Sequence, residues 1–307
     1  MNVLPGMLVV LLCLGVEAFG SCADLIIFSY NRPLQLHAYL ESLEQHVSGL
    51  EKTVVFWRAS DNAFKRGYAL LAKLHHTVLF HEQHHAHAPT NFKPLLQKAV
   101  NEICQQPYLL FGVDDMVVSG TIDLEVCAQA LQSSDALGFY LRLGRNIVSC
   151  YQSVETEHKV LPCPPLKPLG DGINRWRFGG VPFSWRFPHS VDMTVFRRSY
   201  VCEAVNKLDY QSPNTFEKMW SKQKPSSSYG LCFDQSKVVN IPINCVQKDF
   251  RQRHMGAFSV EQLQEIFDAG MKIDIKPLQG VNNKSAHITY TPTFVPDVRL
   301  QKLLPAG

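Results

Sequence analysis

The stretch Asp24-Leu-Ile-Ile-Phe28, followed by Ser29-Tyr-Asn-Arg-Pro33, decides the class of fold. A short, continuous apolar run is typical of a parallel strand that is buried on both faces. Pro33 suits the first position of a helix, because proline lacks the N–H that this position leaves unbonded. Side chains then recur at helical spacing until Gly49, at Leu34, His37, Leu40, Leu43 and Val47. The segment therefore predicts a buried strand that leads directly into a helix.

The same order of strand and helix repeats along the following eighty or so residues. Strands are predicted at Thr53–Trp57, Thr77–Phe80 and Tyr108–Val113, and helices at about 64–74 and 92–104. Strands that alternate with helices are the signature of a parallel sheet with helices on both faces. The first half is therefore predicted to be an α/β nucleotide-binding unit, with ligands beyond the carboxyl ends of the strands.

The second half of the chain is less regular. Pro162–Gly180 is rich in proline and glycine and is predicted to be a long functional loop. An amphipathic helix near the C-terminus is predicted to begin after Ser259 and to end at Gly270. A short strand is expected at Ile288–Tyr290.

The composition is that of an ordinary globular protein. The 307 residues are 46% hydrophobic and 19% charged, which excludes disordered, collagen-like and coiled-coil proteins. The net charge is +3 and no basic run of five residues occurs, so nucleic acid is not expected as a partner. The nine cysteines form no CxxC pair, so most are expected to be buried thiols, and a Cys150–Cys163 disulfide is an open alternative.

Residues 1–22 are predicted to be a signal peptide or a short membrane anchor. An apolar run from Met7 to Val16 is followed by small residues that suit cleavage. The run is shorter than the ~20 residues of a membrane-spanning helix. We therefore expect a location in the secretory-pathway lumen or at a membrane through residues 1–20, and a cytoplasmic location if the leader does not function. A lipoprotein cleavage box at Phe19–Cys22 is a further alternative.

Two adjacent acidic residues, Asp114 and Asp115, follow the last predicted strand of the first half. Adjacent carboxylates at the end of a buried strand are costly unless a positive group neutralises them. A hard divalent cation with attached phosphate oxygens does so. The pair therefore predicts a metal site, and the alternative is a solvated turn.

This order of features resembles the GT-A class of nucleotide-sugar glycosyltransferases, of the family 2 type. Phe28–Pro33 resembles the entry where such enzymes hold the nucleotide, and Leu109–Val118 resembles their acidic DxD-type motif. Here the two acids are consecutive, which departs from the strict D-x-D spacing. The resemblance implies a single GT-A-like α/β domain over residues 23–307, with a mostly parallel sheet.

The same resemblance assigns parts and ligands. It divides the domain into a nucleotide-binding half (residues 23–120) and an irregular acceptor half (residues 121–300). It implies a nucleotide-sugar donor, with UDP favoured, and Mn²⁺ or Mg²⁺ as cofactor. Asp115 would be the direct metal ligand, and Asp114 would reach the metal or the ribose. The late histidine of such enzymes would correspond to His287, as a third ligand.

Other candidates lie at junctions of strands and helices. Arg32 is expected to pair with the diphosphate, together with Asn31 in the same turn, and Lys93 to meet phosphate from another helix start. Ser60 and Asp61 are expected to bind the nucleobase or ribose.

Inverting transfer to an acceptor hydroxyl requires a carboxylate base, for which Asp192 and Glu217 are the candidates. A retaining mechanism without this base is the alternative. The acceptor is a glycan, a protein or a lipid. Trp176, Phe183 and Trp185 are candidates for stacking on a sugar, the alternative being burial in the core.

Two other functions compete with this prediction. His81-Glu-Gln-His-His85 matches the HExxH pattern of zinc metallopeptidases, in which His81 and His85 share a helix face and Glu82 is the base. The pattern follows a predicted strand and is soon interrupted by Pro89, and its alternative is a polar histidine-rich loop that includes His75. The third hypothesis is a non-catalytic protein that binds a nucleotide or a sugar in the same fold.

Overall fold

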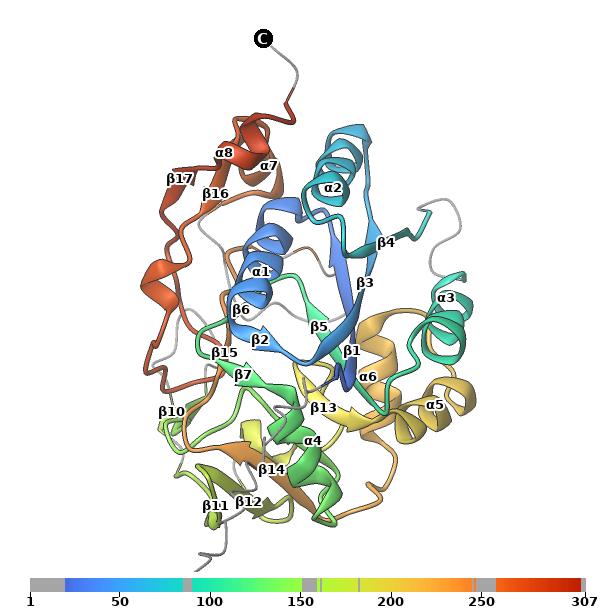
Figure 1. Ribbon diagram of the computed structural model, residues 1–307, viewed down its shortest axis with the longest axis vertical. Coiled ribbons are helices and arrows are strands. Elements are labelled where there is room, and N and C mark those ends of the chain that lie inside the picture. The colour runs from blue at the N-terminus through green and yellow to red at the C-terminus, as the bar shows by residue number, and fades with distance from the viewer. Residues whose placement is uncertain are drawn as a thin grey trace, which may run out of the picture.

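The computed structural model describes residues 20–84, 90–150, 159–160, 162–181, 183–244, 246 and 258–304. The predicted leader up to Phe19 and four histidines, among them His85 and His87, lie outside these residues. The centre of the molecule is a nine-stranded sheet in the order β11-β12-β14-β8-β13-β5-β1-β3-β4 (Figure 1). Both halves of the chain contribute strands to this one sheet.

The first half forms the predicted parallel part of the sheet, and its elements alternate as expected. Strand β1 lies between β5 and β3, and β4 pairs with β3, all in parallel. The elements are β1 (Ala23–Tyr30), α1 (Pro33–His46), β2 (Val47–Ser48), β3 (Leu50–Arg58), α2 (Asn62–Leu74), β4 (Leu79–Glu82), α3 (Phe92–Lys98), a π-helical turn (Ala99–Ile103) and β5 (Tyr108–Val113). The predicted helix at 92–104 therefore changes type after Lys98, and β4 lies two residues later than predicted.

The second half completes the sheet with antiparallel pairs. Strand β13 runs antiparallel to both β5 and β8, and β12 runs antiparallel to both β11 and β14, whereas β14 and β8 are parallel. The elements are β6 (Met116–Val118), β7 (Ile122–Asp123), α4 (Leu124–Gln132), β8 (Gly138–Tyr140), β9 (Ser149–Cys150), β10 (Lys159–Val160), β11 (Lys167–Gly170), β12 (Ile173–Arg177), β13 (Thr194–Arg197), α5 (Arg198–Lys207), α6 (Pro213–Ser221), β14 (Tyr229–Phe233) and β15 (Val238–Asn240). A 3₁₀ turn covers Phe183–Arg186. The α/β class predicted from the sequence is confirmed.

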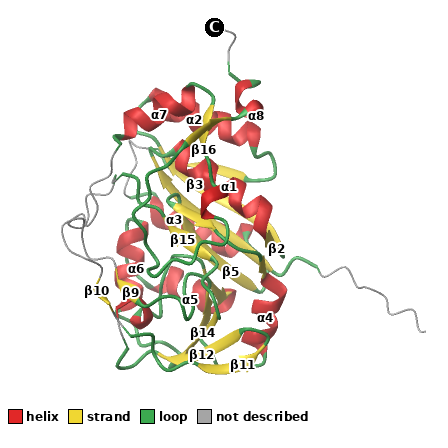
Figure 2. Cartoon of the chain, turned by 90° about the vertical axis from the view of Figure 1, so that its left-hand side faces the viewer, coloured by secondary structure: helices red, strands yellow, loops and turns green. Residues whose placement is uncertain are grey.

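Helices cover both faces of the sheet, and the side chains of β1 show the division. Leu25 and Ile27 join the core with helices α1, α2, α4 and α7, whereas Ile26 and Phe28 join the core with α3, α5 and α6. Successive side chains of a strand point to opposite faces, so a strand covered on both faces has an unbroken apolar run. Figure 2 shows the strands between the two groups of helices.

The C-terminal segment closes the α1 side of the molecule (Figure 1). It contains α7 (Val260–Asp268), β16 (Met271–Ile273), a 3₁₀ turn (Lys276–Leu278), β17 (Phe294–Pro296) and α8 (Val298–Gln301). Ser259 begins α7 with a capping box, as predicted. The strand expected at Ile288–Tyr290 is not formed.

A buried hydrogen-bond chain ties this segment to α1 and α2. His37 of α1 is fully buried, and its ring nitrogens lie 2.7 Å from Asp297 Oδ2 and 3.0 Å from His75 Nε2. The other ring nitrogen of His75 lies 2.5 Å from Glu44 Oε1. Burial lowers the pKa of His37, and the bond from His37 lowers the pKa of Asp297. His75 is thus a buried structural residue rather than part of a polar loop.

One further expectation from the sequence is corrected, and two alternatives that it left open are decided. Pro162–Gly180 is not a loop throughout: it contains the β11–β12 hairpin, in which β11 is the edge strand of the sheet and β12 also pairs with β14. Cys150 and Cys163 are both free thiols. Trp176 and Trp185 are each 2% exposed and donate their ring N–H groups to backbone carbonyls, so they belong to the core. The side chain of Phe183 lies outside the described part.

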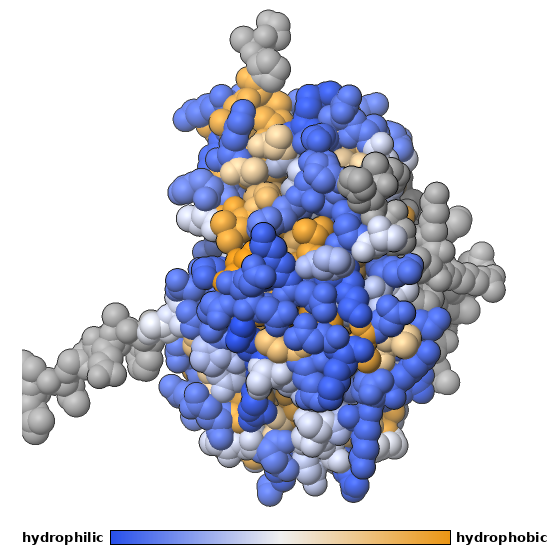
Figure 3. Space-filling view, turned by 90° about the vertical axis from the view of Figure 1, so that its right-hand side faces the viewer, coloured by the Kyte–Doolittle hydropathy of each residue, from blue (hydrophilic) through white to orange (hydrophobic). Residues whose placement is uncertain are grey.

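The face shown in Figure 3 is largely hydrophilic, with small apolar areas between the polar ones. Among the described residues, no helix combines the length and the apolar character needed to cross a membrane.

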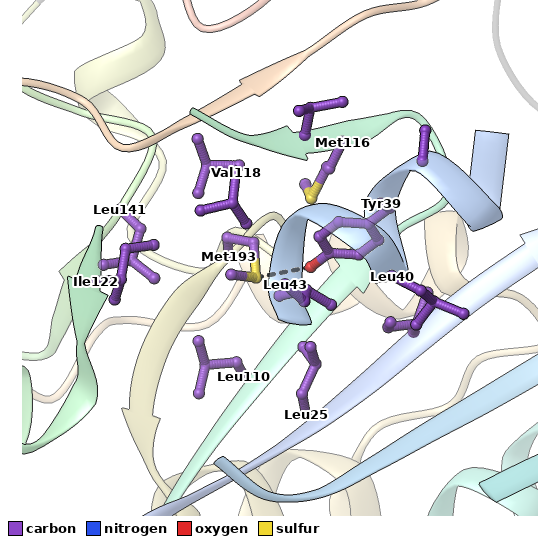
Figure 4. Packing of buried hydrophobic residues seen from close by; sticks show 14 of the residues in the cluster. Leu25, Tyr39, Leu40, Leu43, Leu110, Met116, Val118, Ile122, Leu141 and Met193 are labelled. Atoms are coloured by element: carbon purple, nitrogen blue, oxygen red, sulfur yellow. Dashed lines mark hydrogen bonds between the residues drawn. The ribbon is translucent and has the colours of Figure 1, made fainter. Parts of the chain in front are cut away.

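Gly112 of β5 marks a close approach between the sheet and α1. A Cβ atom at this position would lie 2.4 Å from the hydroxyl oxygen of Tyr39, whose ring packs among apolar residues (Figure 4). Gly112→Ala is therefore expected to lower the free energy of unfolding by about 1–3 kcal/mol, the usual effect of overpacking. Urea denaturation measures the change. Gly179→Ala is the control, because a Cβ there meets no atom within 4 Å. Equal stability of the two variants would contradict the packing seen here.

Candidate active site

The acidic turn joins β5 to β6, and its two carboxylates have different surroundings. Asp114 is 4% exposed, and its Oδ2 accepts hydrogen bonds from Ser29 Oγ at 2.9 Å and from the backbone N–H of Tyr30 at 3.1 Å. Its Oδ1 lies 2.9 Å from Arg32 Nη1. Asp115 is more accessible, and its Oδ1 accepts from the amide of Asn240 at 2.9 Å. The sequence therefore supplies two acids of which Asp115 is the one open to a ligand.

Arg32 lies beneath this turn and is itself 8% exposed. Besides Asp114, its guanidinium donates to the side chain and to the backbone carbonyl of Asn244. Its Nη1 is 3.9 Å from Asp115 Oδ2. Burial raises the pKa of Asp114, and the nearby guanidinium opposes this effect. The structure therefore uses Arg32 to neutralise the acidic turn.

Asn31, Ser60 and Asp61 lie together at the carboxyl ends of β1 and β3. Asn31 has a left-handed backbone with φ of 53°, a conformation that asparagine tolerates. Its side chain exchanges two hydrogen bonds with Ser60, each 2.8 Å long. Asp61 caps α2 by accepting from the backbone N–H groups of Ala63 and Phe64. Lys93 belongs to α3, and its Nζ lies 5.5 Å from the centre of the Tyr210 ring.

A pocket of about 170 Å³ lies next to the acidic turn in the second half of the chain. Its wall brings together both predicted base candidates, Asp192 and Glu217, with the predicted third metal ligand, His287. Arg142 and Cys150 also line it. Residues from four distant parts of the sequence therefore meet in one pocket.

The backbone beside Asp192 is held in an unusual conformation. Met193 has φ of 49°, which strains a residue other than glycine. Its backbone N–H donates to Phe111 O at 2.7 Å, and the Tyr39 hydroxyl contacts its sulfur at 2.8 Å (Figure 4). Such strain persists only where surrounding contacts impose it, and it is common at functional sites. The contacts of Met193 thus fix the direction in which Asp192 leaves the sheet.

The electrostatics of the two carboxylates differ. Asp192 Oδ2 lies 2.6 Å from Arg142 Nη2, whereas Glu217 Oε1 accepts a hydrogen bond from the backbone N–H of Val191 at 3.1 Å. Within the described residues, no Lys, Arg or His nitrogen forms an ion pair with Glu217. Burial, with the nearby negative charge of Asp192, raises the pKa of Glu217 to about 7. Burial also raises the pKa of Asp192, and Arg142 opposes that effect.

Arg142 and Asn240 join the acidic turn to the pocket, and neither residue was predicted from the sequence. Asn240 is 2% exposed; its amide donates to Asp115, and its carbonyl oxygen accepts from Arg142 Nη1 at 2.8 Å. Strand β15 places Asn240 there by pairing with β6, which follows the acidic turn. No sequence signal marks this pairing, because it joins residues more than 120 positions apart.

The described residues fit a divalent cation through Asp115 rather than through Asp114. Both oxygens of Asp114 already accept hydrogen bonds, whereas Asp115 Oδ2 lies 3.9 Å from Arg32 Nη1. No cluster of three His, Cys, Asp or Glu residues in the described part is arranged to hold a metal ion. One carboxylate with substrate phosphates and water is nevertheless a common way of binding Mg²⁺.

The HExxH sequence does not form the helix that a zinc metallopeptidase requires. His81 and Glu82 belong to strand β4, which pairs with β3 at the edge of the sheet. His85 lies outside the described residues. On a strand, neighbouring side chains point to opposite faces, so His81 and Glu82 diverge. Glu82 instead pairs with Lys65 at 3.0 Å.

Comparisons with known proteins identify one curated relative. The chain is 29% identical to the bifunctional glycosyltransferase pgtA of Dictyostelium discoideum, over 86% of this chain and 38% of that protein. The chain thus spans less than two fifths of the length of this relative. No protein-family model matches the chain.

Similar solved structures were also found. TarS 1–349 of S. aureus, in complex with UDP-GlcNAc, is 12% identical, with a TM-score of 0.45, over 81% of this chain and 65% of that one. The mannosyltransferase PcManGT of Pyrobaculum calidifontis, in complex with GDP-Man and Mn²⁺, is 12% identical, with a TM-score of 0.30, over 46% and 44%. The curated relative confirms the resemblance predicted from the sequence: this chain is similar over most of its length to part of a glycosyltransferase.

Proposed function

We propose that the chain transfers a sugar from a nucleotide-sugar donor to a hydroxyl group of an acceptor. The observation that carries the proposal is the continuous polar contact from the acidic turn through Asn240 and Arg142 to Asp192, in a pocket that Glu217 also lines. This arrangement puts a donor site and a candidate base next to each other. The similarity to a glycosyltransferase supports the same reaction class.

The donor lies, in this proposal, over the carboxyl ends of β1, β3 and β5. Ser60 and Asp61 are accessible there and offer hydrogen-bond partners to the nucleoside. Asn31 keeps Ser60 in place, and Arg32 keeps Asp114 and Asp115 neutralised before the donor binds. Asp115 would hold Mn²⁺ or Mg²⁺ together with the diphosphate, and the cation would stabilise the charge on the leaving phosphate. UDP is the favoured nucleotide.

The acceptor, a glycan, a protein or a lipid, places a hydroxyl group in the pocket. In a single displacement, a carboxylate of the pocket takes the hydroxyl proton while the acceptor oxygen bonds to the anomeric carbon. The bond from that carbon to the phosphate oxygen breaks, and the nucleoside diphosphate leaves with the electron pair. Both Asp192 and Glu217 line the pocket, which supports either carboxylate as the candidate base.

Calorimetric binding tests the donor site. We expect the chain to bind UDP or GDP more tightly in the presence of Mn²⁺. The double variant Asp114→Asn/Asp115→Asn is expected to lose this metal-dependent binding, because it removes both carboxylates of the turn.

Asp135→Asn is the matched control, because Asp135 pairs with Arg175 at the surface, away from the acidic turn. If neither nucleotide binds under any metal condition, the proposed function is wrong. Binding without any transfer or donor hydrolysis would instead identify a non-catalytic nucleotide-binding protein.

A further inference from the structure

The pocket contains two carboxylates, Asp192 and Glu217, and its arginine, Arg142, forms an ion pair with Asp192. Arg142 is oriented by Asn240 and directs Nη2 toward Asp192, with Ser190 Oγ 3.3 Å from the same nitrogen. Glu217 belongs to α6, and its Oε1 accepts a hydrogen bond from the backbone N–H of Val191. The two acids therefore have different partners although they line the same pocket.

Asn240 fixes this choice. Its amide group donates to Asp115, and its carbonyl oxygen accepts from Arg142. The reverse orientation would place an N–H group against a guanidinium and a carbonyl oxygen against a carboxylate, so only one orientation satisfies both neighbours. The backbone of Asn240 is also bonded on both sides, to Ala286 O and to the N–H of Ile288. Arg142 consequently has a rigid support that holds it near Asp192.

We propose that Arg142, positioned by Asn240, divides the roles of the two carboxylates: Asp192 remains the ionised partner of the arginine, and Glu217 accepts the proton of the acceptor hydroxyl. This inference rests on the proposed function. Arg142 and Asn240 act as positioning residues, and Glu217 is the catalytic residue. A base works best when its pKa lies near the working pH, and the pKa of Glu217 near 7 agrees with this role.

Other ionisable groups around the pair fit the same assignment. Burial keeps Tyr39 and Tyr140 neutral by raising the pKa of each, and burial lowers the pKa of His189 to about 4. Asp115 raises the pKa of Asp192 from the acidic turn. The remaining groups that line the pocket or share helix α6 are His287, Cys150 and Lys218. Histidine titrates in the same pH range as Glu217, so the test must observe the carboxyl group itself.

The test is a titration of Glu217 followed by the ¹³C shift of its side-chain carboxyl carbon in the full chain, with Glu217→Gln assigning the signal. In the wild type we expect a midpoint near pH 7. Asp192→Asn is expected to lower this midpoint by about one unit or more, because it removes a neighbouring negative charge. Arg142→Gln is expected to raise, by a similar amount, the pH at which the last proton leaves Asp192 and Glu217. The reason is that the two carboxylates would then both be ionised without the nearby guanidinium.

Arg145→Gln is the matched control. Arg145 lies three residues further along the same loop, but it pairs at the surface with Asp234 at 2.8 Å, so the midpoint should not move. Shifts of opposite sign in Asp192→Asn and Arg142→Gln support the inference. An unchanged midpoint in Asp192→Asn, or a wild-type midpoint near that of an ordinary glutamate, overturns the inference. If Arg142→Gln fails to fold, the titration of Asp192→Asn alone still tests it.

Activity separates this inference from the proposed function. The acidic limb of the pH–rate profile should move with the measured midpoint in each variant, whereas a purely structural role would lower the rate equally at all pH values. A wild type that transfers sugar while Asp192→Asn is inactive and Glu217→Gln is active overturns the division of roles but leaves the function standing. If the wild type neither binds nucleotide nor transfers sugar, the proposed function itself is wrong.

Discussion

Glu217→Gln is expected to lower the turnover number for sugar transfer by roughly 10²–10⁴-fold, the usual contribution of a general base. Glutamine keeps the size of the side chain and can still accept from the N–H of Val191, but it cannot take a proton. The donor should bind as tightly as before, because the acidic turn is untouched. Initial rates at saturating donor, together with calorimetric binding of the nucleotide, measure the two effects. A variant that keeps wild-type turnover would exclude Glu217 as the base.

The same substitution is expected to stabilise the protein at alkaline pH. The pKa of Glu217 rises on folding from 4.5 to about 7, so the folded state favours the protonated form. The stability from this group is complete below about pH 4.5 and is lost as pH rises through about 7. At pH 8 the variant should therefore be more stable than the wild type by on the order of 1–3 kcal/mol, and near pH 4 the two should agree.

Urea denaturation at a series of pH values measures this difference. Glu203→Gln is the control, because Glu203 is exposed and pairs with Lys207 on the same helix. A wild type that gains stability over Glu217→Gln as pH rises would show that Glu217 is ionised on folding and has no raised pKa.

Arg32→Met is expected to lower the free energy of unfolding by about 3–5 kcal/mol, the usual effect of removing one partner of a buried ion pair. The variant leaves Asp114 ionised and buried next to Asp115 without its guanidinium. Protonation of Asp114 relieves this penalty, so the loss should be larger at pH 8 than at pH 4. Denaturation at these two pH values checks both the size and the pH dependence.

The double variant Arg32→Met/Asp114→Asn completes the cycle. Removing the charge that Arg32 neutralises should recover part of the lost stability. Arg145→Gln, which removes a surface arginine, should change stability by no more than about 1 kcal/mol. Equal effects of Arg32→Met and Arg145→Gln would contradict the buried role assigned to Arg32.

The parallel half of the fold was predictable because its signals are local. The apolar run of β1, the proline at the start of α1 and the capping residue Ser259 act on neighbouring residues, and each forms the element predicted from it. The Pro162–Gly180 segment was not predictable in this way. Strand β12 of this segment forms because it pairs with β14, more than fifty residues later in the chain. The proline and glycine content of the segment gives no information about that partner.

The candidate site shows the same division. The sequence alone determined that Asp114 and Asp115 follow a buried strand, and that Asp192 and Glu217 are acids available in the second half. Only the tertiary structure decided that Arg32 neutralises the first pair and that Asn240 and Arg142 connect it to the second. A carboxylate's pKa and role depend on burial and on charges within a few ångströms, and those neighbours come from distant parts of the chain. The sequence gives the type of each residue, whereas the burial and the neighbouring charges that give the residue a function arise only when the chain folds.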